Sequence, residues 1–184
     1  MKHLISLHDT TAEEIYDILK LANNGMNEVI VNSPLLEEYI RKTYPDYKLT
    51  SSTCKRITDP DKLIEEVQKD YSIVVLDYDL NNKFDILEKL PCKEKMEILV
   101  NACCNPAFKR RTEHYRILGQ QQIAVCKHIA KKTSRPLDFK DYGVADINCE
   151  CADRTIFNIK ELSTHISPDD IWDKYVPMGF NQFK

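Results

Sequence analysis

The chain has 184 residues, of which 42% are hydrophobic and 30% are charged. This composition is typical of a folded domain with a sizeable core and does not favour disorder. The formal net charge is −3, from 26 basic and 29 acidic residues. A chain with this balance has no overall attraction to nucleic acid or to an anionic membrane.

No apolar run approaches the roughly 20 residues that cross a bilayer, and the N-terminus lacks the pattern of a secretory signal. Seven cysteines are present, an odd number that favours reduced thiols or metal ligands over a framework of disulfides. We therefore expect a cytoplasmic protein that binds neither nucleic acid nor membrane.

Strand and helix patterns alternate along the chain. A helix over residues 11–24 begins with a Thr-x-x-Glu capping pattern and ends at Gly25. Later helices begin at Ser33-Pro34, Asp59-Pro60, residues 85–90, residues 113–132 and Ser167-Pro168. Strands are expected at residues 28–32, 47–53, 72–78, 96–101 and 180–184, and residues 158–166 could hold a sixth, whereas residues 134–153 are expected to form an irregular loop.

Two of these strands, at residues 73–76 and 98–100, are apolar on both faces, which is typical of parallel strands covered by crossover helices. The sequence thus predicts an α/β fold of mainly parallel (β/α) barrel type. About six strands are visible where a closed barrel has eight, so we expect a partial TIM barrel. We divide the chain into an N-terminal helix of uncertain origin, residues 1–24, and a partial (β/α) barrel domain, residues 25–184.

Polar residues follow the expected strands, where parallel α/β folds place their functional loops. Asn32, Asp77 and Asn101 stand at such positions, and each is equally suited to be a helix cap or a turn residue. Beyond the fourth strand, Arg111, Glu113 and His114 concentrate basic, acidic and imidazole groups at the start of the longest helix. They either exchange protons and bind an anionic group or form a charged helix start.

Four cysteines, Cys103, Cys104, Cys149 and Cys151, supply the number of thiolates that a tetrahedral zinc ion or a four-iron cluster requires. Their adjacent and C-x-C spacings differ from the usual C-x-x-C, and buried or idle thiols are the alternative. The sequence contains no G-x-G-x-x-G, P-loop or G-x-S-x-G motif, which excludes the common nucleotide-binding and serine-hydrolase patterns.

Three segments carry a resemblance to a known family: residues 32–39 (NSPLLEEY), residues 100–104 (VNACC) with the following Arg-x-Glu-His-Tyr, and residues 175–184 (YVPMGFNQFK). Residues 24–184 resemble the TIM-barrel superfamily of collagenase-like peptidases and ubiquinone-hydroxylation accessory proteins. The resemblance implies peptide hydrolysis or an accessory role with a [4Fe-4S] cluster held by the four cysteines. This chain has Asn-Pro-Ala-Phe at residues 105–108, where the family would have a further cysteine.

Residues 1–22 are instead similar to the opening helix of ornithine carbamoyltransferases, so a carbamoyltransferase-related fragment is a remote alternative. The carbamoyl-phosphate motif Ser-x-Arg-Thr-Arg of those enzymes is absent, since residues 52–56 read STCKR.

Two hypotheses of different classes follow. In the first, the chain is a peptidase-like hydrolase acting on a small peptide or other anionic substrate, with catalytic Glu113, His114 and Asp77 and with substrate-binding Asn32, Asn101 and Arg111. In the second, it is a non-catalytic binding or accessory module, or a truncated barrel that self-associates through open sheet edges.

Overall fold

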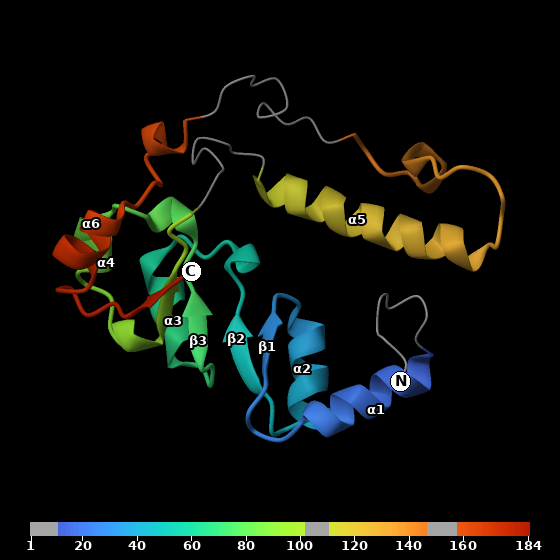
Figure 1. The fold of residues 1–184 in the computed structure, drawn as a ribbon, viewed down its shortest axis with the longest axis horizontal. Coiled ribbons are helices and arrows are strands. Elements are labelled where there is room, and N and C mark those ends of the chain that lie inside the picture. The colour runs from blue at the N-terminus through green and yellow to red at the C-terminus, as the bar shows by residue number, and fades with distance from the viewer. Residues whose placement is uncertain (1–10, 102–110, 147–157) are drawn as a thin grey trace.

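The computed structural model describes residues 11–101, 111–146 and 158–184, and its centre is a five-stranded sheet in which every neighbouring pair is parallel (Figure 1). The strands lie in chain order, β1-β2-β3-β4-β5. They are β1 (Glu28–Val31), β2 (Lys48–Ser51), β3 (Ile73–Val75), β4 (Met96–Ile98) and β5 (Gln182–Phe183). The expected α/β class with a parallel sheet is confirmed.

A helix precedes the sheet and others connect its strands, as the alternating pattern predicts. Because parallel neighbours need a crossover, each connection carries helical turns. The helices are α1 (Ala12–Ala22) before β1, α2 (Pro34–Thr43), α3 (Pro60–Gln68) and α4 (Phe84–Leu87) between successive strands, and α5 (Arg111–Ala130) and α6 (Pro168–Asp170) between β4 and β5. No helix in these ranges combines the length and apolar character needed to cross a membrane.

The helix starts that the sequence predicts are capped as expected. Thr11 forms a full capping box with Glu14, while the side chains of Ser33, Asp59 and Ser167 each accept a hydrogen bond from a backbone N–H of the first turn. Such caps satisfy donors that the helix itself leaves free.

The main core lies between one face of the sheet and the crossover helices. The register aligns Val74 of β3 with Ser51 of β2 and with Met96 of β4, so these side chains share a face. The buried core cluster contains Val74 and Met96 together with Leu63 and Val67 of α3. Burial of these apolar side chains stabilises the packing of the helices against the strands.

The C-terminal segment is joined to the sheet by amide hydrogen bonds. Asn81 Nδ2 donates to the carbonyl oxygens of Leu99 and Thr164, both at 2.8 Å. The buried Tyr175 hydroxyl accepts from the backbone N–H of Asn82 at 2.8 Å. These contacts place residues 158–184 beside the loop that follows β3.

One expected strand is wrong. Residues 158–166 form a 3₁₀ turn, Ile159–Glu161, and irregular backbone instead of a strand. Asn158 caps this turn, because its Oδ1 accepts from the backbone N–H of Lys160 at 3.2 Å. The side chain thus offers the backbone a local partner in place of a strand ladder.

Helix α5 has a small core of its own. Buried Ile117 and Ala124 pack with Val144 and with the partly buried rings of Phe139 and Tyr142. His128 Nδ1 lies 3.0 Å from the Tyr142 hydroxyl. In Figure 1 this helix lies away from the strands, and its N-terminal end lies nearer to them than its C-terminal end.

Candidate functional site

At the carboxyl end of β3, Asp77 caps a 3₁₀ turn, Tyr78–Leu80. Its Oδ1 accepts from the backbone N–H of Asp79 at 2.9 Å. This bond fixes both carboxylates at the edge of the sheet where parallel folds gather functional groups. The Asp77 side chain is only 1% exposed.

Two guanidinium groups meet these carboxylates. Arg111 Nη2 lies 2.7 Å from Asp77 Oδ1 and 2.7 Å from Asp79 Oδ2, and its guanidinium stacks 3.6 Å above the Tyr78 ring. Arg56 pairs with the same two carboxylates, each at 2.9 Å. We call Arg56, Asp77, Asp79 and Arg111 the carboxyl-edge cluster.

The carboxyl-edge cluster leaves several buried donors unused. Arg56 Nε and both Nε and Nη1 of Arg111 have no hydrogen-bond partner among the described residues. A buried donor without a partner costs free energy. Burial also raises the pKa of Asp77, while the Asp79 N–H and the charge of Arg56 act in the opposite direction. The donors suit an anionic oxygen, although Asp77 Oδ2 and Asp79 Oδ1 also have no hydrogen-bond partner among the described residues.

The other expected site residues lie apart from this contact. Glu113 is exposed on the first turn of α5, 3.9 Å from Arg116. His114 is partly buried and its Nδ1 has no hydrogen-bond partner among the described residues. Asn101 is exposed just beyond β4, and Asn32 lines a separate pocket. The structure thus brings Asp77 and Arg111 into contact but not Glu113 or His114 with Asp77.

The four candidate ligand cysteines, Cys103, Cys104, Cys149 and Cys151, lie outside the described residues. Within residues 11–101, 111–146 and 158–184, no group of three or more His, Cys, Asp or Glu side chains is arranged to hold a metal ion.

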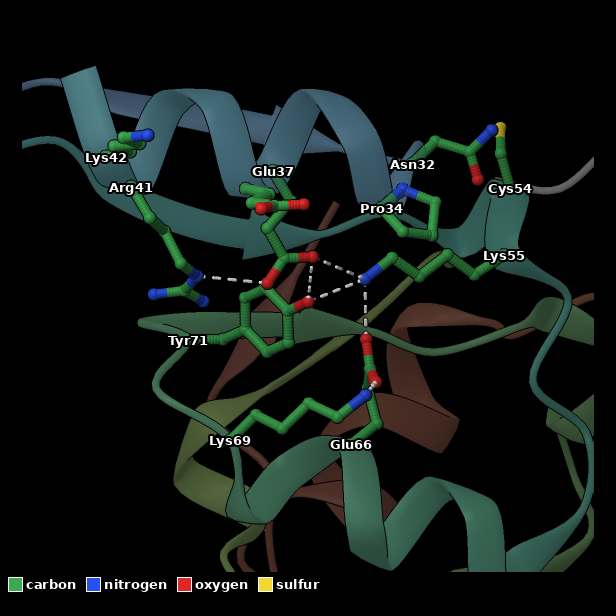
Figure 2. A pocket seen from close by; sticks show the side chains of 11 residues that line it. Asn32, Pro34, Glu37, Arg41, Lys42, Cys54, Lys55, Glu66, Lys69 and Tyr71 are labelled. Carbon is green, nitrogen blue, oxygen red and sulfur yellow. Dashed lines mark hydrogen bonds and ion pairs between the residues drawn. The ribbon is translucent and has the colours of Figure 1, made fainter. Parts of the chain in front are cut away.

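A second feature is a pocket of about 1030 Å³ between α2 and α3 (Figure 2). Glu37 comes from α2, Glu66 from α3, Lys55 from the turn after β2 and Tyr71 from the segment before β3. The lining residues are Asn32, Pro34, Glu37, Glu38, Arg41, Lys42, Cys54, Lys55, Glu66, Lys69 and Tyr71.

An ion network forms the floor of this pocket. Lys55 Nζ donates to Glu66 Oε1 and to the Tyr71 hydroxyl, each at 2.7 Å, and lies 3.5 Å from Glu37 Oε2. The Tyr71 hydroxyl in turn donates to Glu37 at 2.5 Å. Ser51 donates to Glu66 from the strand below at 2.6 Å. Figure 2 shows Glu37, Lys55, Glu66 and Tyr71 pointing toward one another.

The contacts keep the network charged at neutral pH. Burial raises the pKa of Glu66, but hydrogen bonds from Lys55, Lys69 and Ser51 outweigh it and bring the pKa to about 2. Burial lowers the pKa of Lys55, yet its bonds to Glu66 and Tyr71 give a net rise. Lys55 is therefore an ammonium ion and has no lone pair for nucleophilic attack.

Sequence reasoning missed Glu37, Glu66 and Tyr71 as a group. One signal was present, because Glu66 falls between Leu63 and Val67 on the buried stripe of α3. A carboxylate at such a position requires a partner.

Comparison with known proteins adds no relative: no protein-family model, curated protein or solved structure matches this chain.

Proposed function

We propose that the chain is part of a (β/α) barrel related to the collagenase-like peptidases and ubiquinone-hydroxylation accessory proteins. The strand order supports this proposal, because strands that follow one another around a parallel sheet are the arrangement of a singly wound barrel. A doubly wound sheet would reverse its order at a switch point.

We further propose a peptidase-like hydrolase that takes a small peptide or other anionic substrate at the carboxyl edge of the sheet. The observation that carries this proposal is that guanidinium nitrogens of Arg56 and Arg111, beside β3, have no hydrogen-bond partner in the part of the chain that the structure describes. A substrate carboxylate would accept from these donors, since guanidinium forks match carboxylates.

His114 is the proposed proton-transfer group of this site. It lies three residues after Arg111 on α5, and residues at this spacing share a helix face. Glu113, on the same turn, is the second candidate for proton transfer. Asp77 would act by holding Arg111 in place, because both of its carboxylate oxygens contact guanidinium groups.

The test is turnover of a defined peptide mixture, followed by mass spectrometry. We expect His114→Ala to lower turnover by about 10²-fold or more, the typical contribution of a general acid or base. His128→Ala, on the same helix but beside Tyr142, is the matched control and should retain turnover. Equal turnover by the wild type and His114→Ala would contradict the proposed role of His114 in proton transfer.

A non-catalytic binding module is the second candidate, and the ion pairs of Asp77 with both Arg56 and Arg111 favour it, because they leave this carboxylate a structural role. Binding of the peptides without turnover would select this alternative.

Anaerobic purification with iron, sulfide and zinc analysis tests an accessory role through a cluster on the four cysteines. Colourless, metal-free, folded protein would remove the cluster from the proposal.

A further inference from the structure

We propose that the pocket between α2 and α3 is a second binding site, which takes a short peptide carrying both an acidic and a basic side chain. It differs from the carboxyl-edge cluster in its residues and in its place on the sheet. Its floor lies over β2, through the contact of Ser51 with Glu66. The proposal is independent of any reaction at the carboxyl edge.

The ion network is costly for a purely structural contact between two helices. The side chains of Glu66, Lys55 and Glu37 are only 4%, 14% and 17% exposed. Apolar residues of similar volume often stabilise such a position as well as buried ion pairs do. An ion network that borders an open pocket of this size therefore serves to recognise a ligand.

The network is also pre-organised. Lys55 has contacts for all three of its N–H bonds, and Tyr71 is held by both Lys55 and Glu37. Arg41 is fixed by Glu37 at 3.0 Å and by the backbone carbonyl of Asp70 at 2.8 Å. Groups already held in place lose little conformational entropy when a ligand binds.

The rim offers free charges of both signs. Glu38 and Lys42, one turn apart on α2, are exposed, and their side chains form no hydrogen bond or ion pair with any described residue. Lys69, across the pocket on the α3 side, bonds only to Glu66 among the described residues, which leaves two of its N–H groups for a ligand. A ligand of one charge sign would leave part of this rim unmatched.

The dimensions suit a peptide of a few residues. The pocket volume of about 1030 Å³ lies just above the usual range for small-molecule sites, which leaves room for a few residues of peptide. Charged side chains would contact the rim, while the peptide backbone would lie over Pro34 and the aliphatic stems of the lysines.

The experiment is a titration of the isotope-labelled full chain, followed by amide NMR, with the peptide acetyl-Glu-Ala-Ala-Lys-amide. The matched neutral peptide has Gln at both charged positions. We expect saturable shifts at Lys42, Lys69 and Tyr71 with the charged peptide, weaker binding by the neutral one, and weaker binding at high salt.

Paired variants test which residues of the pocket bind the charged peptide. Glu38→Ala with Lys42→Ala should raise the Kd for the charged peptide by about tenfold, as expected for loss of two exposed charge contacts. The control is Lys62→Ala with Glu65→Ala, exposed residues of α3 that do not line the pocket. The control should bind like the wild type, and the amide spectra show whether each variant is folded.

The proposal would be overturned by no saturable binding, by equal binding of charged and neutral peptides, or by unchanged affinity in the Glu38 and Lys42 variant. Shifts confined to Asp79 and Asn81 would also overturn it and would support the carboxyl-edge site instead. Failure at the carboxyl edge, shown by unchanged Asp79 and Asn81 amides, leaves the α2–α3 site standing if Lys42 and Tyr71 shift.

Discussion

Glu66 shows how one residue can serve both the core and a pocket. It lies on the buried stripe of α3, yet its carboxylate accepts hydrogen bonds from Lys55, Lys69 and Ser51. A buried carboxylate is tolerated only when such partners hold it. The same contacts order Lys55 and Tyr71 at the pocket floor.

We expect Glu66→Gln to destabilise the protein at pH 7 by roughly 1–3 kcal/mol, since charged hydrogen bonds become neutral ones. The folded pKa of Glu66, about 2, lies below its ordinary value of 4.5. Its stabilising contribution is therefore complete above pH 4.5 and is lost as the pH falls toward 2. Urea unfolding of both proteins at several pH values measures this.

Glu65, the exposed neighbour of Glu66 on α3, supplies the control. Glu65→Gln should change the free energy of unfolding by no more than about 0.5 kcal/mol. A gap between wild type and Glu66→Gln that stays constant from pH 7 to pH 2 would contradict the assigned pKa.

Among the elements, α3 is the helix whose burial the sequence reveals best. Leu63 and Val67 are each 1% exposed, and both belong to the main core. Their i, i+4 spacing places them on one face, as the hydrophobic pattern predicts.

We expect Leu63→Ala to lower the free energy of unfolding by about 2–5 kcal/mol, the usual cost of a cavity in a packed core. Leu35 of α2 is 77% exposed, and Leu35→Ala should cost less than about 0.5 kcal/mol. Chemical unfolding of the two variants measures the difference, and similar values for both would contradict the assignment of this face to the core.

The first residue of helix α5 makes a polar contact with the turn that follows β3. Arg111 at its first position is buried against Asp77, Asp79 and the Tyr78 ring, whereas the rest of the helix packs in a separate small cluster. This contact fixes where the helix begins relative to β3.

We expect Arg111→Ala to speed amide hydrogen exchange in residues 115–120 by about tenfold or more while β2 and β3 keep their protection. The reason is local opening of α5 when its buried ion pairs are removed. Arg116→Ala is the control, since that side chain is 55% exposed. Unchanged exchange in Arg111→Ala would show that other contacts hold the helix.

In the whole molecule, the sheet has two outer strands. β1 and β5 each have one neighbour in the described structure, and Ile30 of β1 is 53% exposed. Unpaired strand edges with apolar side chains favour association with another chain.

If this edge drives self-association, light scattering will show a mass that rises with concentration, and Ile30→Lys will lower it by adding charge at the edge. Leu35→Lys adds the same charge on α2 and should not change the mass. A wild-type monomer at all concentrations would contradict the edge hypothesis.

The sequence alone determined the order of elements and the parallel character of the sheet. Apolar periodicity, capping residues and doubly apolar strands are local signals, and the helix starts at Ser33, Asp59 and Ser167 follow from them. The sequence also pointed to Asp77 and Arg111 as functional candidates. It failed at residues 158–166, where side-chain bonding of Asn158 replaces a strand.

Only the tertiary structure decided which charges meet. Asp77 and Arg111 are 34 residues apart, as are Glu37 and Tyr71, and no local pattern relates such positions. Their contacts depend on the register of neighbouring strands and on the packing of helices over them. For this reason the sequence predicts a strand-end site, whereas the charged pocket between α2 and α3 appears only in the folded chain.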